Sequence, residues 1–353
     1  MRQESKVKIW RVEDGEGNQR LDRWLRRRYT ALQQSRIEQM CRRGELRVDG
    51  RRVKAATRVE EGQEIRVPPL AYSTPNLMIA KSRCSGEDVT LIQSAVLYKD
   101  DHIIVLNKPP GLPVQGGSKQ KRHIDGLSRY LRFGNDEHPR LVHRLDKDTS
   151  GVLLLARTRS VAMALSESFR HRKTRKIYWA LVAGVPTPYQ GEVASGLVKV
   201  KSVDRDKAKR KMRVIAPQDV KQIPNAKHAH THYATLFRVA RRAAWVALEP
   251  VTGRTHQLRA HMADIGHPII GDNTYGRSSQ ENAGDGWGAR IGGIIEDKLH
   301  LHARSLTIEH PKTRRLISFC ADLPEHMLAS WAVFDWSVEM ASSDPFSVRD
   351  SRC

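Results

Sequence analysis

The stretch LVHRLDKDTSGVLLLA, residues 141–156, combines a charged loop with an apolar segment near the middle of this chain. Five ionisable side chains crowd positions 143–148, and Ser150-Gly151 then leads into an apolar run that is typical of a buried strand. A carboxylate in a polar loop beside such a strand, flanked by cations, can stay ionised while partly removed from water. Asp146 is therefore a candidate catalytic carboxylate, and a loop aspartate that only caps a turn is the alternative.

Short apolar runs recur on both sides of this loop. The pattern predicts one helix at residues 160–170 and strands at residues 102–109, 151–158, 178–184, 233–239 and 244–251. Many short strands with few helices are typical of an α+β domain built on a mixed, mostly antiparallel sheet. We expect a linker-like insertion within residues 201–229, where KSVDRDKAKRK is nearly all charged, and we expect the glycine-rich residues 277–297 to be a loop.

A second polar cluster lies in EPVTGRTHQLRAHMADIGHPIIGD, residues 249–272. Gly253 permits a tight turn after a strand, and polar side chains follow it at close intervals: Arg254, His256, Gln257, Arg259, His261 and His267. The two histidines at 256 and 261 do not share a helical face, and those at 228, 230 and 232 alternate as on a strand with no cysteine or acid nearby to complete a ligand set. The sequence thus predicts no metal site, and we expect His256 and His261 to hydrogen-bond backbone or RNA.

Residues 1–70 have the pattern of a small separate module. Apolar spacing predicts a first helix near residues 21–29, and Ser35 with Glu38 has the spacing of a capping box for a second helix that ends near Gly44. These residues hold 18 Lys/Arg and 11 Asp/Glu, a net charge of +7, so RNA contact is favoured over a merely solvated face. Arginines crowd the two predicted helices: Arg26, Arg27, Arg28, Arg36, Arg42 and Arg43.

A hairpin and a strand complete this module. Asp49-Gly50 interrupts an alternating segment, which is a strong hairpin signal, and Pro68 ends a last strand. We therefore divide the chain into four parts: the module 1–70, a linker 71–93, a catalytic domain 94–330 and a C-terminal tail 331–353.

The composition favours a polyanionic partner. The 353 residues include 61 Lys+Arg and 39 Asp+Glu, a net charge of +22, and such an excess attracts nucleic acid. An anionic membrane is the competing partner, but the sequence has no apolar run of roughly 18 residues. The four cysteines lie far apart and predict reduced thiols, which with the acidic residues near the N-terminus indicates a cytoplasmic protein.

Several common catalytic motifs are absent from the sequence. It contains no GxxxxGKS/T phosphate loop, no GxGxxG after a strand, no GxSxG elbow and no CxxC pair. Few reactions on RNA are open to a basic protein that has a cation-flanked aspartate but no nucleotide or metal motif. Isomerisation of uridine, which needs neither cofactor nor metal, is one of them.

The motif HRLDKDTSG at residues 143–151 resembles the catalytic motif of the RluA-type pseudouridine synthases. The resemblance covers about residues 95–320 and includes the segments at 100–114, 174–184 and 252–272 in the order of that family. Residues 1–70 resemble the S-four RNA-binding module, so the whole chain is most similar to the RluC-like branch that modifies large-subunit ribosomal RNA. The basic, histidine-containing stretch 201–232 departs from the family pattern and leaves the choice of substrate open.

The resemblance implies a role for individual residues. It makes Asp146 the essential aspartate, Tyr178 the tyrosine that packs on the target base and accepts the carbon-5 proton, and Arg254 the arginine that pairs with Asp146. Arg144 would fill the space left by the flipped uridine, and Leu258 would form an apolar wall of the pocket. Further RNA contacts are expected from Arg26, Arg27, Arg36, Arg42, Arg43, His256 and Arg259.

Other functions are compatible with the same surface. One is an inactive RNA-binding or ribosome-assembly factor, which would have no use for the trio Asp146, Tyr178 and Arg254. Another is a synthase that acts on transfer RNA or messenger RNA, although the N-terminal module favours ribosomal RNA. A metal-dependent nuclease is the least favoured, because the sequence lacks a carboxylate cluster. We expect a monomer that uses no cofactor and no metal and binds no membrane.

Overall fold

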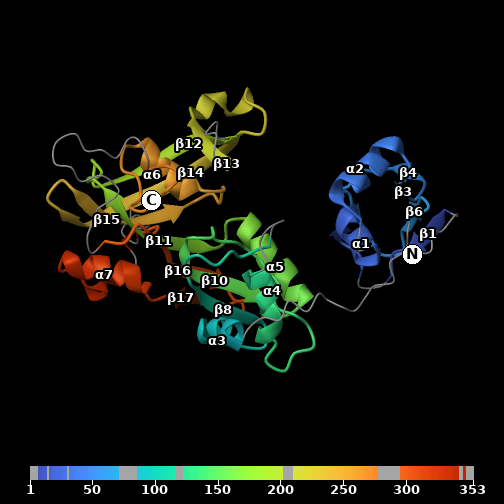
Figure 1. Ribbon diagram of the computed structural model, residues 1–353, viewed down its shortest axis with the longest axis horizontal. Coiled ribbons are helices and arrows are strands. Elements are labelled where there is room, and N and C mark those ends of the chain that lie inside the picture. Colours follow the sequence, from blue (N-terminus) through green and yellow to red (C-terminus); the bar gives the residue numbers. More distant parts are fainter. Residues whose placement is uncertain are drawn as a thin grey trace. The chain divides into compact units, whose positions relative to one another are not determined.

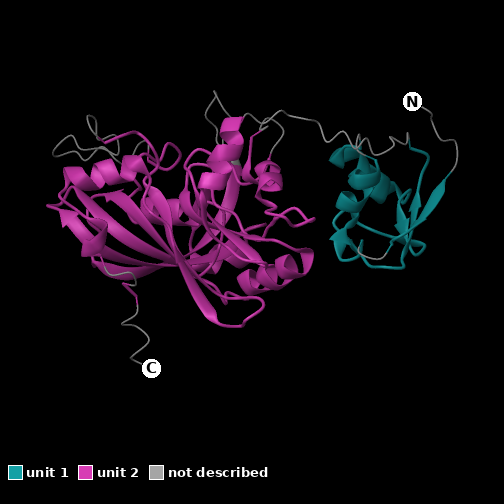
Figure 2. Cartoon of the chain, turned by 90° about the horizontal axis from the view of Figure 1, so that it is seen from below, with its two compact units in different colours: residues 1–83 teal, residues 84–353 magenta. Residues whose placement is uncertain are grey.

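The computed structural model describes residues 7–13, 16–29, 32–70, 86–116, 122–201, 210–276, 295–341 and 345–346. The chain divides into two compact units, residues 1–83 and 84–353, which are coloured separately in Figure 2. Among the described residues, no helix is both long and apolar enough to cross a membrane.

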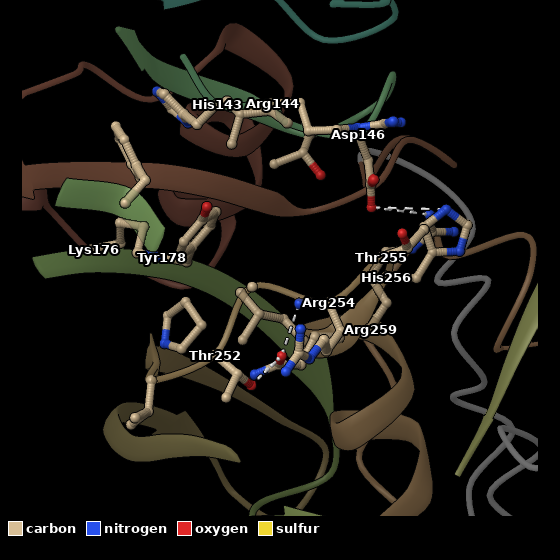
Figure 3. Close-up of a pocket in the computed structure, with 18 of the residues that line it drawn as sticks. His143, Arg144, Asp146, Lys176, Tyr178, Thr252, Arg254, Thr255, His256 and Arg259 are labelled. Carbon is tan, nitrogen blue, oxygen red and sulfur yellow. Dashed lines mark hydrogen bonds and ion pairs between the residues drawn. The ribbon is translucent and has the colours of Figure 1, made fainter. Parts of the chain in front are cut away.

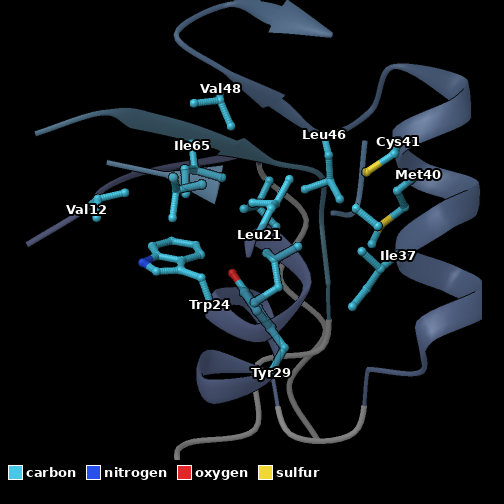
Figure 4. Packing of buried hydrophobic residues seen from close by; sticks show 14 residues of the cluster. Val12, Leu21, Trp24, Tyr29, Ile37, Met40, Cys41, Leu46, Val48 and Ile65 are labelled. Atoms are coloured by element: carbon cyan, nitrogen blue, oxygen red, sulfur yellow. The ribbon is translucent and has the colours of Figure 1, made fainter. Parts of the chain in front are cut away.

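The first unit packs two helices against short strands. Its elements are β1 (Lys8–Arg11), β2 (Gln19–Arg20), α1 (Leu21–Arg28), α2 (Gln34–Arg43), β3 (Arg47–Val48), β4 (Arg51–Arg52), β5 (Arg58–Val59) and β6 (Glu64–Val67). The sheet order is β1-β6-β3-β4, and β2 pairs with β5. Figure 4 shows the core, where Leu21 and Trp24 of α1 and Ile37 and Met40 of α2 meet Ile65 of β6, all fully buried.

Turn residues fix the ends of these elements. Gly44 ends α2 in the left-handed conformation, with φ of 70°, and positive φ at Asp49 and Gly50 makes the tight hairpin between β3 and β4. The predicted capping box is wrong. Helix α2 begins at Gln34, so Ser35 is already helical, and the N-cap residue Gln33 makes no side-chain hydrogen bond to the helix.

The second unit is built on one large sheet (Figure 1). Its strand order is β13-β12-β14-β15-β11-β16-β10-β8-β7, with β17 on β16 and β9 on β10. The strands are β7 (Val96–Lys99), β8 (Ile103–Lys108), β9 (Arg140–Leu141), β10 (Ser150–Ala156), β11 (Arg175–Ala183), β12 (Gln190–Lys201), β13 (Arg210–Ile215), β14 (Lys227–Val239), β15 (Ala243–Pro250), β16 (Leu301–Glu309) and β17 (Leu316–Cys320). The mixed, mostly antiparallel α+β architecture is confirmed, since only β10 and β16 run parallel among the described pairs.

Helices cover both faces of this sheet because its central strands are apolar on both sides. Trp179 of β11 and Trp245 of β15 pack against Trp331 of α7 (Glu325–Val333). From the opposite face, Val182 and its neighbours contact Met262 of α6 (Gln257–Asp264). Figure 1 shows α6 and α7 on opposite sides of these strands.

The other half of the sheet repeats this arrangement. Leu106 of β8 and Leu153 of β10 pack with Ile92 of α3 (Gly86–Ser94), together with α4 (Ile124–Leu127) and η1 (Ser128–Leu131). Leu154 faces the other way, toward Leu165 of α5 (Arg159–Arg170). The predicted helix at 160–170 is confirmed by α5, and η2 (Pro217–Lys221) and η3 (Val338–Met340) complete the helical elements of the described chain.

Gly151 allows the parallel strands β10 and β16 to approach closely. It pairs with Ala303 and adopts a φ of +105°, and a Cβ atom here would collide with the carbonyl group of Ala303. Only glycine fits such a position without moving the backbone. The glycine therefore fixes the strand that follows the Asp146 loop.

Two predicted boundaries are wrong. Helix α3 lies within the predicted linker 71–93 and packs in the core of the second unit, whereas residues 71–85 lie outside the described part. The predicted tail 331–353 begins inside α7 and supplies Trp331 to the core. The linker-like insertion is predicted within 201–229, and residues 202–209 of its charged run lie outside the described part. In the rest of that range, residues 210–215 form β13, residues 217–221 form η2, and β14 starts at residue 227. The expected loop 277–297 lies outside the described residues up to 294.

Candidate active site

A cavity of about 460 Å³ opens beside the Asp146 loop (Figure 3). It is lined by the loop from His143 to Thr149, by Lys176 and Tyr178 of β11, and by residues 250–259 between β15 and α6. Its size is in the usual range for small-molecule sites, roughly 300–1,000 Å³. The segments that the sequence singled out separately thus meet around one pocket.

His143 ties the Asp146 loop to the sheet. Its Nε2 atom accepts a hydrogen bond of 2.8 Å from the backbone N–H of Leu154, and its ring stacks on Phe169 with centroids 4.6 Å apart. Burial, together with the charge of Lys176, lowers the pKa of His143 to about 3. The imidazole is therefore neutral at physiological pH, as an acceptor at Nε2 must be.

Lys108 holds the same loop through hydrogen bonds to backbone carbonyl groups. Its fully buried ammonium group donates to the carbonyl oxygens of Pro109, Leu112 and Lys147 at 2.8–2.9 Å. Burial lowers the pKa of Lys108 to about 7, although the charges of Asp148 and Asp146 oppose the shift. The bond to Lys147 fixes the backbone one residue beyond Asp146.

One arginine and one histidine approach the Asp146 carboxylate, of which a fifth is exposed. His256 Nε2 and Arg259 Nη1 each lie 3.8 Å from Asp146 Oδ2, and Figure 3 shows them converging on it. Arg259 is buried and also makes a bidentate pair with Asp272, at 2.7 Å through both Nε and Nη2. Asp272 accepts two backbone hydrogen bonds as well, from Thr274 and Tyr275. Arg259 therefore bridges a buried carboxylate and the candidate catalytic one.

The prediction that Arg254 pairs with Asp146 is wrong. Arg254 lines the pocket, but its Nε donates to the backbone carbonyl of His228 at 2.9 Å, and its ion pair with Asp146 is absent from the described contacts. Arg259 occupies that position instead. Arg259 is only 7% exposed but lines the cavity, and its predicted contact with RNA stays a prediction.

His256 stands at the start of α6 in the left-handed conformation, with φ of 52°. Its Nδ1 atom hydrogen-bonds the hydroxyl of Tyr275 at 3.1 Å, which turns the other ring nitrogen toward Asp146. Burial lowers the pKa of His256 even though the nearby Asp146 charge opposes this. His261 points elsewhere: both its nitrogens hydrogen-bond side chains, those of Ser195 and Thr231.

Tyr178 and Leu258 contribute the less polar lining. Both border the cavity, and Tyr178 stands on the same face of β11 as Lys176. Burial raises the pKa of Tyr178 far above its usual value, and the Asp146 charge raises it further. The side chain is therefore a neutral phenol at physiological pH.

The rim of the pocket is basic. Exposed Arg144 and partly exposed Arg254, both singled out by the sequence, are joined by Arg170, Arg172 and Lys176. We did not predict the last three, although the run FRHRKTRK at residues 169–176 signals a local excess of positive charge. In the first unit the predicted arginines are exposed on α1 and α2: Arg26, Arg27, Arg36, Arg42 and Arg43.

A pocket with an aspartate beside a buried arginine, under a cationic rim, suits an enzyme that acts on a polyanion. Residues 102–264 match the family model "RNA pseudouridylate synthase", and residues 19–65 match the S4 domain. The chain belongs to the pseudouridine synthase family and is an isomerase that acts on RNA.

Individual relatives resemble the chain over most of its length. It is 33% identical to ribosomal large subunit pseudouridine synthase C of Vibrio cholerae, across 92% of this chain and 95% of that protein. It is 35% identical to the mitochondrial RNA pseudouridine synthase 4 of Arabidopsis thaliana, across 86% and 76%. The solved human RNA pseudouridylate synthase domain containing 4 is 30% identical with a TM-score of 0.53, and the match covers 69% of this chain and 94% of that one.

Proposed function

We propose that this synthase isomerises uridines of large-subunit ribosomal RNA and that Asp146 is its reacting carboxylate. The placement of Asp146 supports the second part, because it is the acidic side chain in the described lining of the cavity and is flanked by Arg259 and His256. The substrate is supported by the likeness to ribosomal large subunit pseudouridine synthases and by the S4 domain.

RNA binding would begin with the phosphates. Phosphate contacts fix the position of a protein on RNA, whereas the pocket selects the base. We assign these contacts to the exposed arginines of α1 and α2 and to the rim residues Arg144, Arg170 and Arg172. A uridine must then leave its stack to enter the cavity, at a free-energy cost of a few kcal/mol that is smallest in loops and distorted helices.

Asp146 would act on the glycosidic bond of the flipped uridine. The bond between uracil N1 and the ribose anomeric carbon breaks, with Asp146 as a nucleophile at that carbon or as a base at the neighbouring one. The uracil turns within the pocket, and its carbon 5 bonds to the anomeric carbon. As this bond forms, Asp146 leaves the anomeric carbon, or returns the proton that it took from the neighbouring carbon. Carbon 5 then loses its proton and N1 gains one, so the product is an isomer of uridine and no cofactor is consumed.

The other residues fit this sequence of steps. Arg259 would orient Asp146, since an arginine held by two bonds to Asp272 cannot move far. Tyr178 would wall the pocket and keep the freed uracil from water. Its raised pKa keeps the Tyr178 hydroxyl neutral in the free protein, and its acceptance of the carbon-5 proton stays a prediction.

The test compares two aspartates of one loop. Asp146→Asn should abolish pseudouridine formation and keep RNA affinity within roughly tenfold, because phosphate contacts supply most of the binding free energy. Asp148→Asn, at an exposed position two residues later, makes the same charge change and should retain turnover. Product from the Asp146→Asn protein, with deamidation excluded by mass spectrometry, would remove Asp146 from this role.

Mapping pseudouridines in cells with and without the gene tests the substrate. Sites lost from large-subunit ribosomal RNA support the proposal, whereas sites lost only from transfer RNA redirect it, and unchanged RNA indicates an inactive binding protein. The monomeric state and the cytoplasmic location remain predictions.

A further inference from the structure

Glu192, His230 and His232 gather on one face of the sheet, outside the lining of the cavity. His230 Nε2 lies 3.0 Å and His232 Nδ1 lies 3.7 Å from Glu192 Oε2, and the two imidazole rings have centroids 4.6 Å apart. One nitrogen or oxygen atom from each residue lies within 4.8 Å of the others. We propose that these three side chains bind a divalent transition-metal ion, with Zn²⁺ the ion they suit best.

Strand pairing creates this group. His230 and His232 are two residues apart on β14, so they point to the same face. Glu192 stands on the neighbouring strand β12, directly opposite His232 in the antiparallel register. The sequence predicts no site here because no acid lies near the histidines along the chain. The pairing of β12 with β14, which are adjacent in Figure 1, supplies that acid from 38 positions away.

The spacing of these atoms is close to that of a metal site. Bonds of about 2.0–2.2 Å in a tetrahedron place ligand atoms about 3.3–3.6 Å apart. The two distances of 3.0 and 3.7 Å bracket this range, so small rotations of the partly exposed side chains can close the set. Three protein ligands leave the fourth position to water, which reaches the group because the Glu192 side chain is 61% exposed.

The chemistry of the ligands selects the metal. Two imidazoles and one carboxylate suit Zn²⁺ and its transition-metal neighbours, whereas Mg²⁺ prefers oxygen ligands alone. Two nearby residues that could also serve as metal ligands already bond other side chains. His261 bonds Ser195 and Thr231, and Glu249, which faces His232 from the other side, pairs with Arg175 at 2.7 Å.

A metal at this site would stabilise β14, the strand that holds one wall of the catalytic pocket. The backbone of His230 accepts hydrogen bonds from the Val251 N–H and the Gln257 side chain, and its N–H donates to Thr252 Oγ1. Residues 251–257 form one wall of the cavity. A metal that joins β12 to β14 at His230 therefore stabilises the strand on which this wall rests, without touching the reacting atoms.

Calorimetric titration of the untagged full-length protein with Zn²⁺ tests the proposal. The variants Glu192→Gln, His230→Gln and His232→Gln each remove one ligand. His171→Gln is the matched control, since His171 lies 3.9 Å from Glu167 on α5 as an exposed pair of the same two residue types. Circular dichroism verifies that each variant is folded.

We expect one tight Zn²⁺ equivalent in the wild type and in His171→Gln, with affinity at least about tenfold weaker in each ligand variant. Added Zn²⁺ should raise the melting temperature of the wild type and the control, and do so much less in the ligand variants, whereas Mg²⁺ should not compete. Equal Zn²⁺ affinity in all five proteins, an equal loss in His171→Gln, or competition by Mg²⁺ would each overturn the proposal.

Discussion

Replacing Arg259 with methionine, and comparing the result with the same change at Arg254, would distinguish the roles of the two arginines in the motif TGRTHQLR. Methionine keeps the unbranched shape but removes the bidentate bond to Asp272, whose side chain has no exposure to water. Removing one partner of a buried ion pair costs about 3–5 kcal/mol of stability. The two backbone bonds to Asp272 from Thr274 and Tyr275 remain, so we expect the lower part of this range.

The same change should slow catalysis. Asp146 would lose its buried guanidinium partner at 3.8 Å, and an interaction with a charged group worth about 1.5–3 kcal/mol corresponds to roughly a 10- to 150-fold slower step. Arg254→Met removes one bond to the His228 carbonyl, worth about 1 kcal/mol, and should leave the rate at saturating RNA nearly unchanged.

The assay combines urea unfolding with single-turnover rates at saturating RNA for both variants. The double variant Arg259→Met/Asp272→Asn separates the two effects, because it removes the uncompensated buried charge and should recover stability without recovering the rate. If Arg254→Met slows the step as much as Arg259→Met does, or the double variant recovers full turnover, then the assignment of Arg259 to Asp146 is wrong.

Three further predictions follow from other parts of the chain. Burial lowers the pKa of His302 to about 3 and those of His300 and His261 to about 4. Between these values and about 6.5, each of these histidines is protonated in the unfolded chain but neutral in the folded chain. Stability should therefore fall as pH drops from 6.5 toward 4, by up to about 1.4 kcal/mol per pH unit for each histidine, and a flat urea midpoint between pH 7.5 and 5.5 would contradict this. A chain that begins at residue 84 should keep its rate at saturating RNA but bind more weakly, with a log–log salt slope reduced by about 0.7–0.9 per lost phosphate contact; an unchanged slope would show that the first unit does not grip RNA. Turnover should survive dialysis against a chelator, since Glu192, His230 and His232 do not line the cavity, and a loss that zinc restores would link the metal to the chemistry.

Local patterns were enough to predict the main elements. The apolar runs at 102–109 and 151–158 became β8 and β10, and Asp49-Gly50 became a tight turn, because periodicity and turn chemistry act over a few residues. The boundary errors have a tertiary cause. Helix α3 has a weak apolar pattern and is held by Ile92 against the sheet, which a search for linkers by composition does not detect.

The site shows more sharply what a single sequence can specify. Both Arg254 and Arg259 follow the turn at Gly253, and no local rule distinguishes them as the partner of Asp146. The distinction arises because Arg254 precedes α6 and turns to the backbone of β14, whereas Arg259 lies within α6 and reaches Asp272, 13 residues further along the chain. The carboxylate that anchors Arg259 lies 13 residues further along the chain, so this contact depends on the fold, as does the pairing that brings Glu192 to His232. In both cases the residue type was visible in the sequence, but its partner was set by the fold.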